Sequence, residues 1–242
     1  MKGQDRQNLD QQHREQPAGV GEAGTLASSV YHQIRRDILN GSLRPGEKLR
    51  SEFLRHRYQA GGSPVREALN RLSADGLVAR EDQKGFSVKK VSREDLTELV
   101  LTRCWLEEIA LRESIQNRTA AWEESLVLAF HRLSRVPRSS RTETYSPNPN
   151  WEALHQLFHL TLISACGSKL LLSFCGQMND LADRYRQLAI IASYPKRNEL
   201  EEHRAIMEAA INGQADEAVE RIKAHYHRTA EILFQSGSGL WE

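Results

Sequence analysis

The sequence predicts a mainly α-helical protein in two parts: three small helices with a β-hairpin, followed by an all-helical bundle. Three observations predict it. Between residues 26 and 75, apolar residues recur at helical spacing in three short segments. Residues 77–90 then hold two alternating segments around a turn. No strand-like alternation follows residue 90, and 242 residues with 39% hydrophobic content suffice for one large domain or two smaller ones.

The front part begins with two predicted helices. In ASSVYHQIRRDILNGSL, Val30, Ile34 and Ile38 share one stripe, and Asn40-Gly41 is typical of a helix end. The segment RPGEKL predicts a turn into a short extended piece, and SEFLRHRYQ predicts a second short helix. Residues 1–24 are rich in Gln, Gly and Asp without apolar periodicity, so we expect a flexible arm there.

The third predicted helix lies in GGSPVREALNRLSADGLV and begins at residue 63 or 64. Ser63 is a favourable N-cap, and Pro64 suits the first helical position. The buried face of this helix has apolar residues at helical spacing: Val65, Ala68, Leu69 and Leu72. Arg66 then lies in the first turn, where the helix dipole disfavours a cation by a few tenths of a kcal/mol unless an anion is near.

A β-hairpin completes the front part. LVAR and FSVKK predict two strands joined by EDQKG, with Phe86 and Val88 facing inward and Ser87 and Lys89 outward. Three small helices followed by a hairpin make a winged helix-turn-helix, which we place at residues 25–90.

The back part is predicted to be helical throughout. Ser92 with Asp95 resembles a capping box that opens a long helix through about residue 116. Later breaks are the loop RVPRSSRTETYSPNPN, Gly167, Pro195 and Asn212-Gly213. We expect an all-α domain of roughly six helices over residues 91–236, and a tail at 237–242.

Charge and cysteine content limit the function further. Residues 25–90 carry 13 Lys/Arg against 7 Asp/Glu, whereas residues 91–242 carry 17 against 21, which favours a nucleic-acid module in front. No apolar run is long enough to span a membrane, and the polar first residues lack a signal-peptide core, so we expect a cytoplasmic protein. Cys104, Cys166 and Cys175 lack Cys-x-x-Cys spacing, which favours buried free thiols.

The motifs PGEKLRSEFLRHRY, GSPVREALNRLSADGLV and QKGFSV resemble those of the GntR family of bacterial transcription regulators. The back part resembles the FCD ligand-binding domain of the FadR branch, and the resemblance covers about residues 26–235. It implies that the helix beginning at Ser63 lies in the major groove of a double-stranded DNA operator, with the wing reaching toward the minor groove. Arg66 would then meet a phosphate or a guanine edge, the alternative being an ion pair with Glu52.

The DNA contacts that we predict come from the helices and from the wing: Arg50, Ser63, Arg66, Arg71, Gln83, Lys84 and Gly85. Gly85 permits the tight hairpin, and Lys84 can reach a phosphate or the minor groove. Many relatives carry an arginine where this chain has Gly62, so one contact of the family is missing. We expect a homodimer, paired mostly through the acidic helical domains, on a palindromic operator.

The resemblance also implies an effector pocket, often with a metal held by an Asp-x-x-x-His pair and two further histidines. Here HQLFH places His155 and His159 one turn apart, with His155 where the family more often has Asp. His203 and His225 match the later positions, and they lie level across an antiparallel helix pair that turns near residue 213. Four imidazoles without thiolates suit a divalent metal such as zinc or nickel, unless His155 binds the effector instead.

Three arginines, Arg103, Arg184 and Arg186, are candidates for holding a small carboxylate effector; the alternative is ordinary ion pairing on helix surfaces. The segments LISACGSKLLL and LADRYR are similar to those of a glutarate-responsive repressor in this branch. We therefore expect a repressor of a catabolic operon that an organic acid releases from DNA.

The sequence leaves two alternative functions. A metal-dependent hydrolase of the His-Glu-x-x-His type needs a glutamate general base where this chain has Gln156, so we do not expect an enzyme. The other alternative is a DNA-binding protein without a ligand switch.

Overall fold

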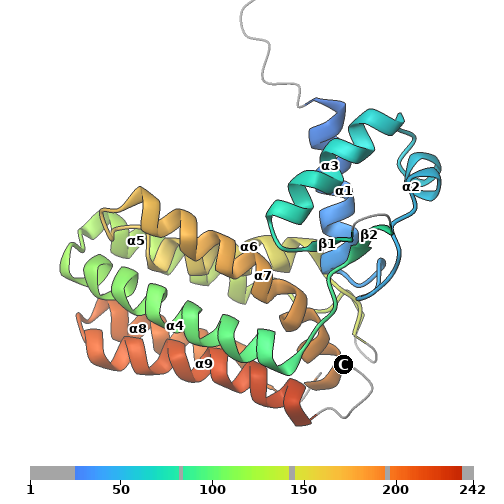
Figure 1. Ribbon diagram of the computed structural model, residues 1–242. Coiled ribbons are helices and arrows are strands. Elements are labelled where there is room, and N and C mark those ends of the chain that lie inside the picture. The colour runs from blue at the N-terminus through green and yellow to red at the C-terminus, as the bar shows by residue number, and fades with distance from the viewer. Residues whose placement is uncertain (1–24, 82–83, 142–144, 194–196, 236–242) are drawn as a thin grey trace, which may run out of the picture.

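The computed structural model describes residues 25–81, 84–141, 145–193 and 197–235. Within these ranges it has nine α-helices and one two-stranded sheet. Figure 1 shows the small helices and the hairpin at one end of a bundle of longer helices. The predicted flexible arm, the wing residue Gln83, Pro195 and the tail all lie outside the described residues.

The front part is the winged helix-turn-helix that the sequence predicts. It consists of α1 (Leu26–Leu39), α2 (Ser51–Arg57), α3 (Gly62–Ala74), β1 (Val78–Glu81) and β2 (Gly85–Val88). The strands are antiparallel, with Val78 opposite Val88, and Lys48 forms an isolated bridge to Ser87. The apolar stripes of the three helices meet in a core of their own around Ile34, Leu69 and Leu72.

The third helix starts earlier than predicted. It begins at Gly62 with Gly61 as N-cap, so Ser63 is the second helical residue and not the cap. Glycine is itself an acceptable N-cap, and the extended backbone of Gly61 (φ −69°, ψ 167°) leads directly into the helix. Arg66 consequently lies just beyond the first turn, where the helix dipole disfavours a cation less.

The back part has six helices within the described residues. They are α4 (Arg93–Gln116), α5 (Ala120–Ser134), α6 (Pro149–Leu162), α7 (Lys169–Ser193), α8 (Glu199–Ile211) and α9 (Ala215–Gln235). The hydroxyl of Ser92 accepts a hydrogen bond from the backbone N–H of Asp95, which confirms the predicted cap. Helix α4 packs against α7 and α9, and α5 packs against α6 and α8 (Figure 1).

The bundle has a separate apolar core that extends from Val91 to Leu233. Cys104, Cys166 and Cys175 are buried there as free thiols. None of the helices in the described ranges combines the length and the apolar composition that crossing a membrane requires.

One bundle helix, α7, contacts the winged helix directly. Arg35 of α1 forms an ion pair with Asp180 of α7, with 2.5 Å between the charged atoms. The neighbouring Leu181 packs against the apolar core of the winged helix. Helix α7 therefore connects the interior of the bundle to the front part of the chain.

Candidate functional site

Four histidine side chains converge inside the bundle. His155 and His159 come from α6, His203 from α8 and His225 from α9, and all four are buried. The Nε2 atom of His159 lies 3.2 Å from Nε2 of His155 and 3.3 Å from Nε2 of His203. One ring nitrogen of each histidine lies within 4.8 Å of the others. The fold thus brings together all four residues that the sequence singled out.

These distances suit a divalent metal ion. Zinc binds imidazole nitrogen at about 2.0–2.1 Å, and tetrahedral geometry then separates neighbouring ligand nitrogens by about 3.3 Å. The two Nε2–Nε2 distances around His159 agree with that separation. Imidazole donors without thiolate suit zinc, nickel and similar ions.

Two polar partners fix the orientation of the rings. The Nδ1 atom of His225 lies 2.7 Å from Oε2 of Glu202, so an Nδ1–H donor to this carboxylate leaves Nε2 free to bind a metal. Nδ1 of His159 lies 3.3 Å from the hydroxyl of Tyr226, which donates to Glu107. Glu202 and Tyr226 were not predicted, although each directly adjoins a cluster histidine in the chain.

Burial keeps the cluster neutral. It lowers the pKa of His155, His159 and His203 well below the usual range, and neighbouring positive charges lower it further. Burial also lowers the pKa of His225, although its hydrogen bond to Glu202 opposes the shift. Neutral imidazole is the form that binds a metal, so the cluster is ready for one at neutral pH.

We expect the metal-free protein to lose stability as the pH falls below about 6.5, the ordinary histidine pKa. Histidines in the unfolded chain take up protons there, whereas the buried rings stay neutral to lower pH, so the unfolded state binds more protons. Each such histidine contributes a slope of up to about 1.4 kcal/mol per pH unit. Urea unfolding between about pH 7.5 and 5.5 measures this slope. His159→Gln should reduce it and His227→Gln, at an exposed position, should not; equal slopes would contradict the prediction.

A cavity of about 30 Å³ adjoins the histidines, and Arg103 and Arg186 also border it. This volume has room for an ion or a water molecule, but an acid of several carbons needs more space. The side chain of Arg103 donates to Glu107 at 2.6 Å and to Asn179 at 2.9 Å. Burial would lower the pKa of Arg103, but the charge of Glu107 outweighs it and raises the pKa, so Arg103 remains a cation.

The side chain of Arg186 has unused hydrogen-bonding capacity. It forms ion pairs with Glu152 and with Asp183, the latter at 3.1 Å. Its Nη1 atom is buried and has no hydrogen-bond partner among the described residues. Burial would lower the pKa of Arg186, but the charges of Asp183 and Glu152 raise it. An unpartnered cationic donor beside the histidines is suited to an anionic acceptor.

Arg184 lies elsewhere, which corrects the prediction that groups it with the other effector-binding arginines. It donates to the backbone carbonyl oxygens of Lys89 and Lys90, at 2.7 and 3.0 Å. It borders a different cavity, of about 270 Å³, that also includes Gly76 of the winged helix. Two residues apart on a helix, Arg184 and Arg186 point to nearly opposite sides, so one faces the winged helix and the other faces the bundle interior.

Most predicted DNA contacts lie on the outer surface of the winged helix. Arg50, Ser63, Arg66, Lys84 and Gly85 are exposed. In the described part of the chain Arg66 has neither an ion pair nor a side-chain hydrogen bond, so the alternative pairing with Glu52 is not formed. Gly85 has a φ of +87°, a conformation that favours glycine in a tight hairpin.

Two further residues of α3 bear on the predicted DNA interface. Arg71 donates to the hydroxyl of Ser28 at 3.2 Å and lies 4.3 Å above the ring of Tyr31, so it is held against α1. Asn70 was not predicted, yet it is exposed one turn after Arg66. The spacing of four residues was the available signal for it.

A winged helix with an unpaired cation on its third helix, joined to a helical domain with a buried polar centre, defines a two-domain DNA-binding regulator. The chain belongs to the gntR family of bacterial regulatory proteins, whose profile matches residues 26–88, and the FCD domain profile matches residues 98–228. The chain is therefore a transcriptional regulator and not an enzyme.

Curated relatives agree with this assignment. The chain is 34% identical to the uncharacterized HTH-type transcriptional regulator BphR of Paraburkholderia xenovorans, over 91% of this chain and 90% of that protein. It is 29% identical to the HTH-type transcriptional repressor GlaR of Escherichia coli, over 86% and 96% of the two chains. Among solved structures, E. coli McbR/YncC shares the fold, with a TM-score of 0.72 at 20% identity over 88% of this chain and 98% of that one.

Proposed function

We propose that the protein represses a catabolic operon, binds a palindromic operator as a homodimer, and leaves it when a small organic acid binds beside a divalent metal in the helical domain. The observation that carries the proposal is the buried histidine cluster next to the Nη1 donor of Arg186, which has no hydrogen-bond partner among the described residues. Helix α7 supplies Arg186 and also contacts the winged helix.

In this proposal His159, His203 and His225, together with His155, hold zinc or nickel. With five or six ligands such an ion keeps a position for one carboxylate oxygen, and Arg186 can take the other end of the acid. All four ligands are neutral imidazoles, so the bound ion retains its full charge. That charge favours an anionic ligand.

Release of DNA requires a difference between two arrangements of the protein. A ligand shifts the equilibrium only if it binds the DNA-incompetent arrangement more tightly. The cavity of about 30 Å³ is too small for an acid of several carbons, so the side chains around it must move when such an acid binds. Because α7 borders this cavity and contacts α1, that movement has a direct path to the winged helix.

An exposed apolar surface supports the homodimer. Leu101, Trp105 and Ile109 follow one another every fourth residue on α4, and Leu170 and Phe174 lie on α7, which packs against α4. These side chains are between 43% and 67% exposed. Clustered exposed apolar residues are typical of protein interfaces, and a two-fold axis would give each copy one half-site of the operator. We call these five residues the α4–α7 face.

Arg66→Ala should weaken specific operator binding by about 1–3 kcal/mol, or roughly 5- to 150-fold, if Arg66 reads a base edge. Fluorescence anisotropy at one fixed salt concentration, with a binding sequence selected from random DNA, measures the change. Arg132→Ala, an exposed arginine of α5, is the matched control and should bind like the wild type. Unchanged affinity of Arg66→Ala would remove Arg66 from the interface.

Operator release by small acids tests the function as a whole. A panel of mono- and dicarboxylates that includes glutarate is titrated into the complex of protein and operator, with metal-loaded and with metal-stripped protein. The proposal expects release by at least one acid, at lower concentration when the metal is present. If no acid changes operator affinity in either form, the chain is a DNA-binding protein without a ligand switch.

A further inference from the structure

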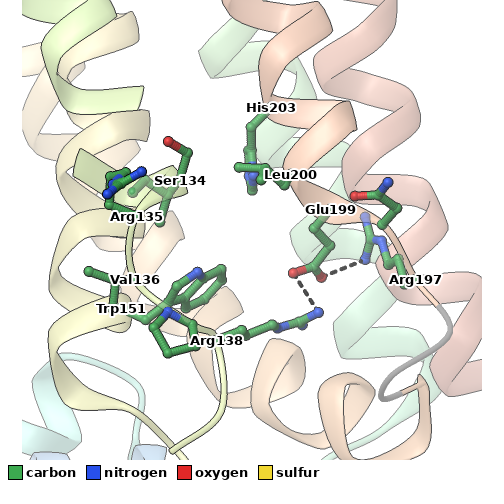
Figure 2. A pocket seen from close by; sticks show the side chains of 12 residues that line it. Ser134, Arg135, Val136, Arg138, Trp151, Arg197, Glu199, Leu200 and His203 are labelled. Atoms are coloured by element: carbon green, nitrogen blue, oxygen red, sulfur yellow. Dashed lines mark ion pairs between the residues drawn. The ribbon is translucent and has the colours of Figure 1, made fainter. Parts of the chain in front are cut away.

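A larger cavity, of about 460 Å³, lies between the end of α5, the start of α6 and the start of α8 (Figure 2). His203 borders it, but it shares no lining residue with the small cavity beside Arg103 and Arg186. Sites for small molecules typically measure about 300–1,000 Å³. This cavity therefore has room for a complete small molecule without any rearrangement.

The lining of this larger cavity combines an apolar wall with excess positive charge. The apolar residues are Leu133, Val136, Pro137, Trp151 and Leu200. The charged residues are three arginines and a single glutamate, namely Arg135, Arg138, Arg197 and Glu199. A lining of this composition suits a ligand with an apolar body and a negative charge.

Arg138 is the cation in this cavity that has unused hydrogen-bonding capacity. One of its terminal nitrogens lies 2.6 Å from Oε2 of Glu199, and its guanidinium lies 5.3 Å from the ring centroid of Trp151. Its Nε atom is buried and lacks a hydrogen-bond partner within the described ranges. Burial lowers the pKa of Arg138, and the negative charge of Glu199 reverses only part of this shift. A second anion would stabilise this guanidinium.

We propose that this cavity is a second ligand site, which binds an organic acid with an apolar body by pairing its carboxylate with Arg138. The apolar body of the acid lies against Leu133, Val136 and Leu200. The site rests on its own cavity and cation, and it requires no metal at the histidines.

Glu199 keeps a cationic partner when it releases Arg138. Its other oxygen lies 3.3 Å from Nη1 of Arg197, so it keeps a cationic partner when Arg138 turns toward a ligand. Arg197 in turn is anchored by Glu202, at 2.6 Å. Exchange of one carboxylate for another at Arg138 therefore leaves no buried charge unpaired.

Isothermal titration calorimetry of the full-length, metal-stripped protein tests the proposal, with benzoate and hexanoate as probes. We expect one molecule of at least one of these acids to bind per chain. Benzyl alcohol, which lacks the charge, and acetate, which lacks the apolar body, should bind at least tenfold more weakly. Absence of binding by both acids at about 10 mM would overturn the proposal.

Variants locate the binding site. Arg138→Gln should weaken binding at least tenfold, because it removes a charge-assisted hydrogen bond, whereas Arg132→Gln should have no effect. If Arg138→Gln fails to fold, Val136→Trp fills the apolar end, retains the charge and should also block binding. Unchanged binding in a folded variant of either kind overturns the proposal. Loss of binding in Arg186→Gln, with Arg138→Gln unaffected, would instead place the acid beside the histidines.

Discussion

Replacing His203 and His225 together by alanine is expected to reduce the metal content from about one divalent ion per chain to less than about a tenth. The two residues come from α8 and α9, and their loss removes half of the imidazole ligands. Two ligands on one helix then remain, which is too few for a stable zinc or nickel site. Elemental analysis after dialysis against metal-free buffer measures the content. In the wild type, the content should also fall at pH values below about 6, because protons compete for the same nitrogens.

The matched control replaces two exposed histidines, His131→Ala/His227→Ala, and should keep the ion. The His203→Ala/His225→Ala variant should also require a higher acid concentration to leave its operator. If it retains the full metal content and releases the operator at the wild-type concentration, the metal switch is wrong. The assignment of the winged helix does not depend on this result.

Trp105→Glu is expected to raise the dissociation constant of the proposed homodimer roughly a thousandfold. Trp105 is 58% exposed at the middle of the apolar stripe on α4. Truncation of a central aromatic at an interface costs about 2 kcal/mol or more, and a two-fold axis makes each substitution count twice. The buried glutamate adds a desolvation cost. Sedimentation velocity across a range of protein concentrations measures the constant.

Leu128→Glu is the control for the dimer, because Leu128 is an exposed apolar residue of α5, outside the α4–α7 face. It should leave the dimer intact. A monomer produced by Leu128→Glu, together with an intact Trp105→Glu dimer, would move the interface to α5. Loss of the dimer should also reduce the affinity for a palindromic operator, since each copy then binds one half-site alone.

Local spacing was sufficient to predict two histidine pairs, but not the cluster of four. His155 and His159 are one helical turn apart, and His203 and His225 lie at similar distances from the turn near Gly213, so backbone geometry alone brings each pair together. Whether the two pairs meet depends on how α6 lies against α8 and α9. Their meeting was predicted from the family resemblance.

The features that were not predicted depend on tertiary structure or on two local signals of similar strength. Arg184 and Arg186 look alike in the sequence, and only the rotation of α7 in the bundle decides which guanidinium faces the cavity. Glu202 acts through a contact with His225 of another helix. Gly61 and Ser63 are both acceptable caps and lie two residues apart, so the start of α3 was open to an error of up to two residues.

The contact between α7 and α1 limits how the winged helix can be exchanged between such regulators. Asp180 and Leu181 lie six and five residues before Arg186 on one helix. About 9 Å of α7 therefore both contacts the winged helix and borders the cavity beside the histidines. Recombination that exchanges only residues 25–90 would supply a new DNA specificity but discard the partner of Asp180. A productive hybrid needs a cation at the position of Arg35 and a surface that accepts Leu181. The winged helix and α7 of this chain therefore form a matched pair of surfaces.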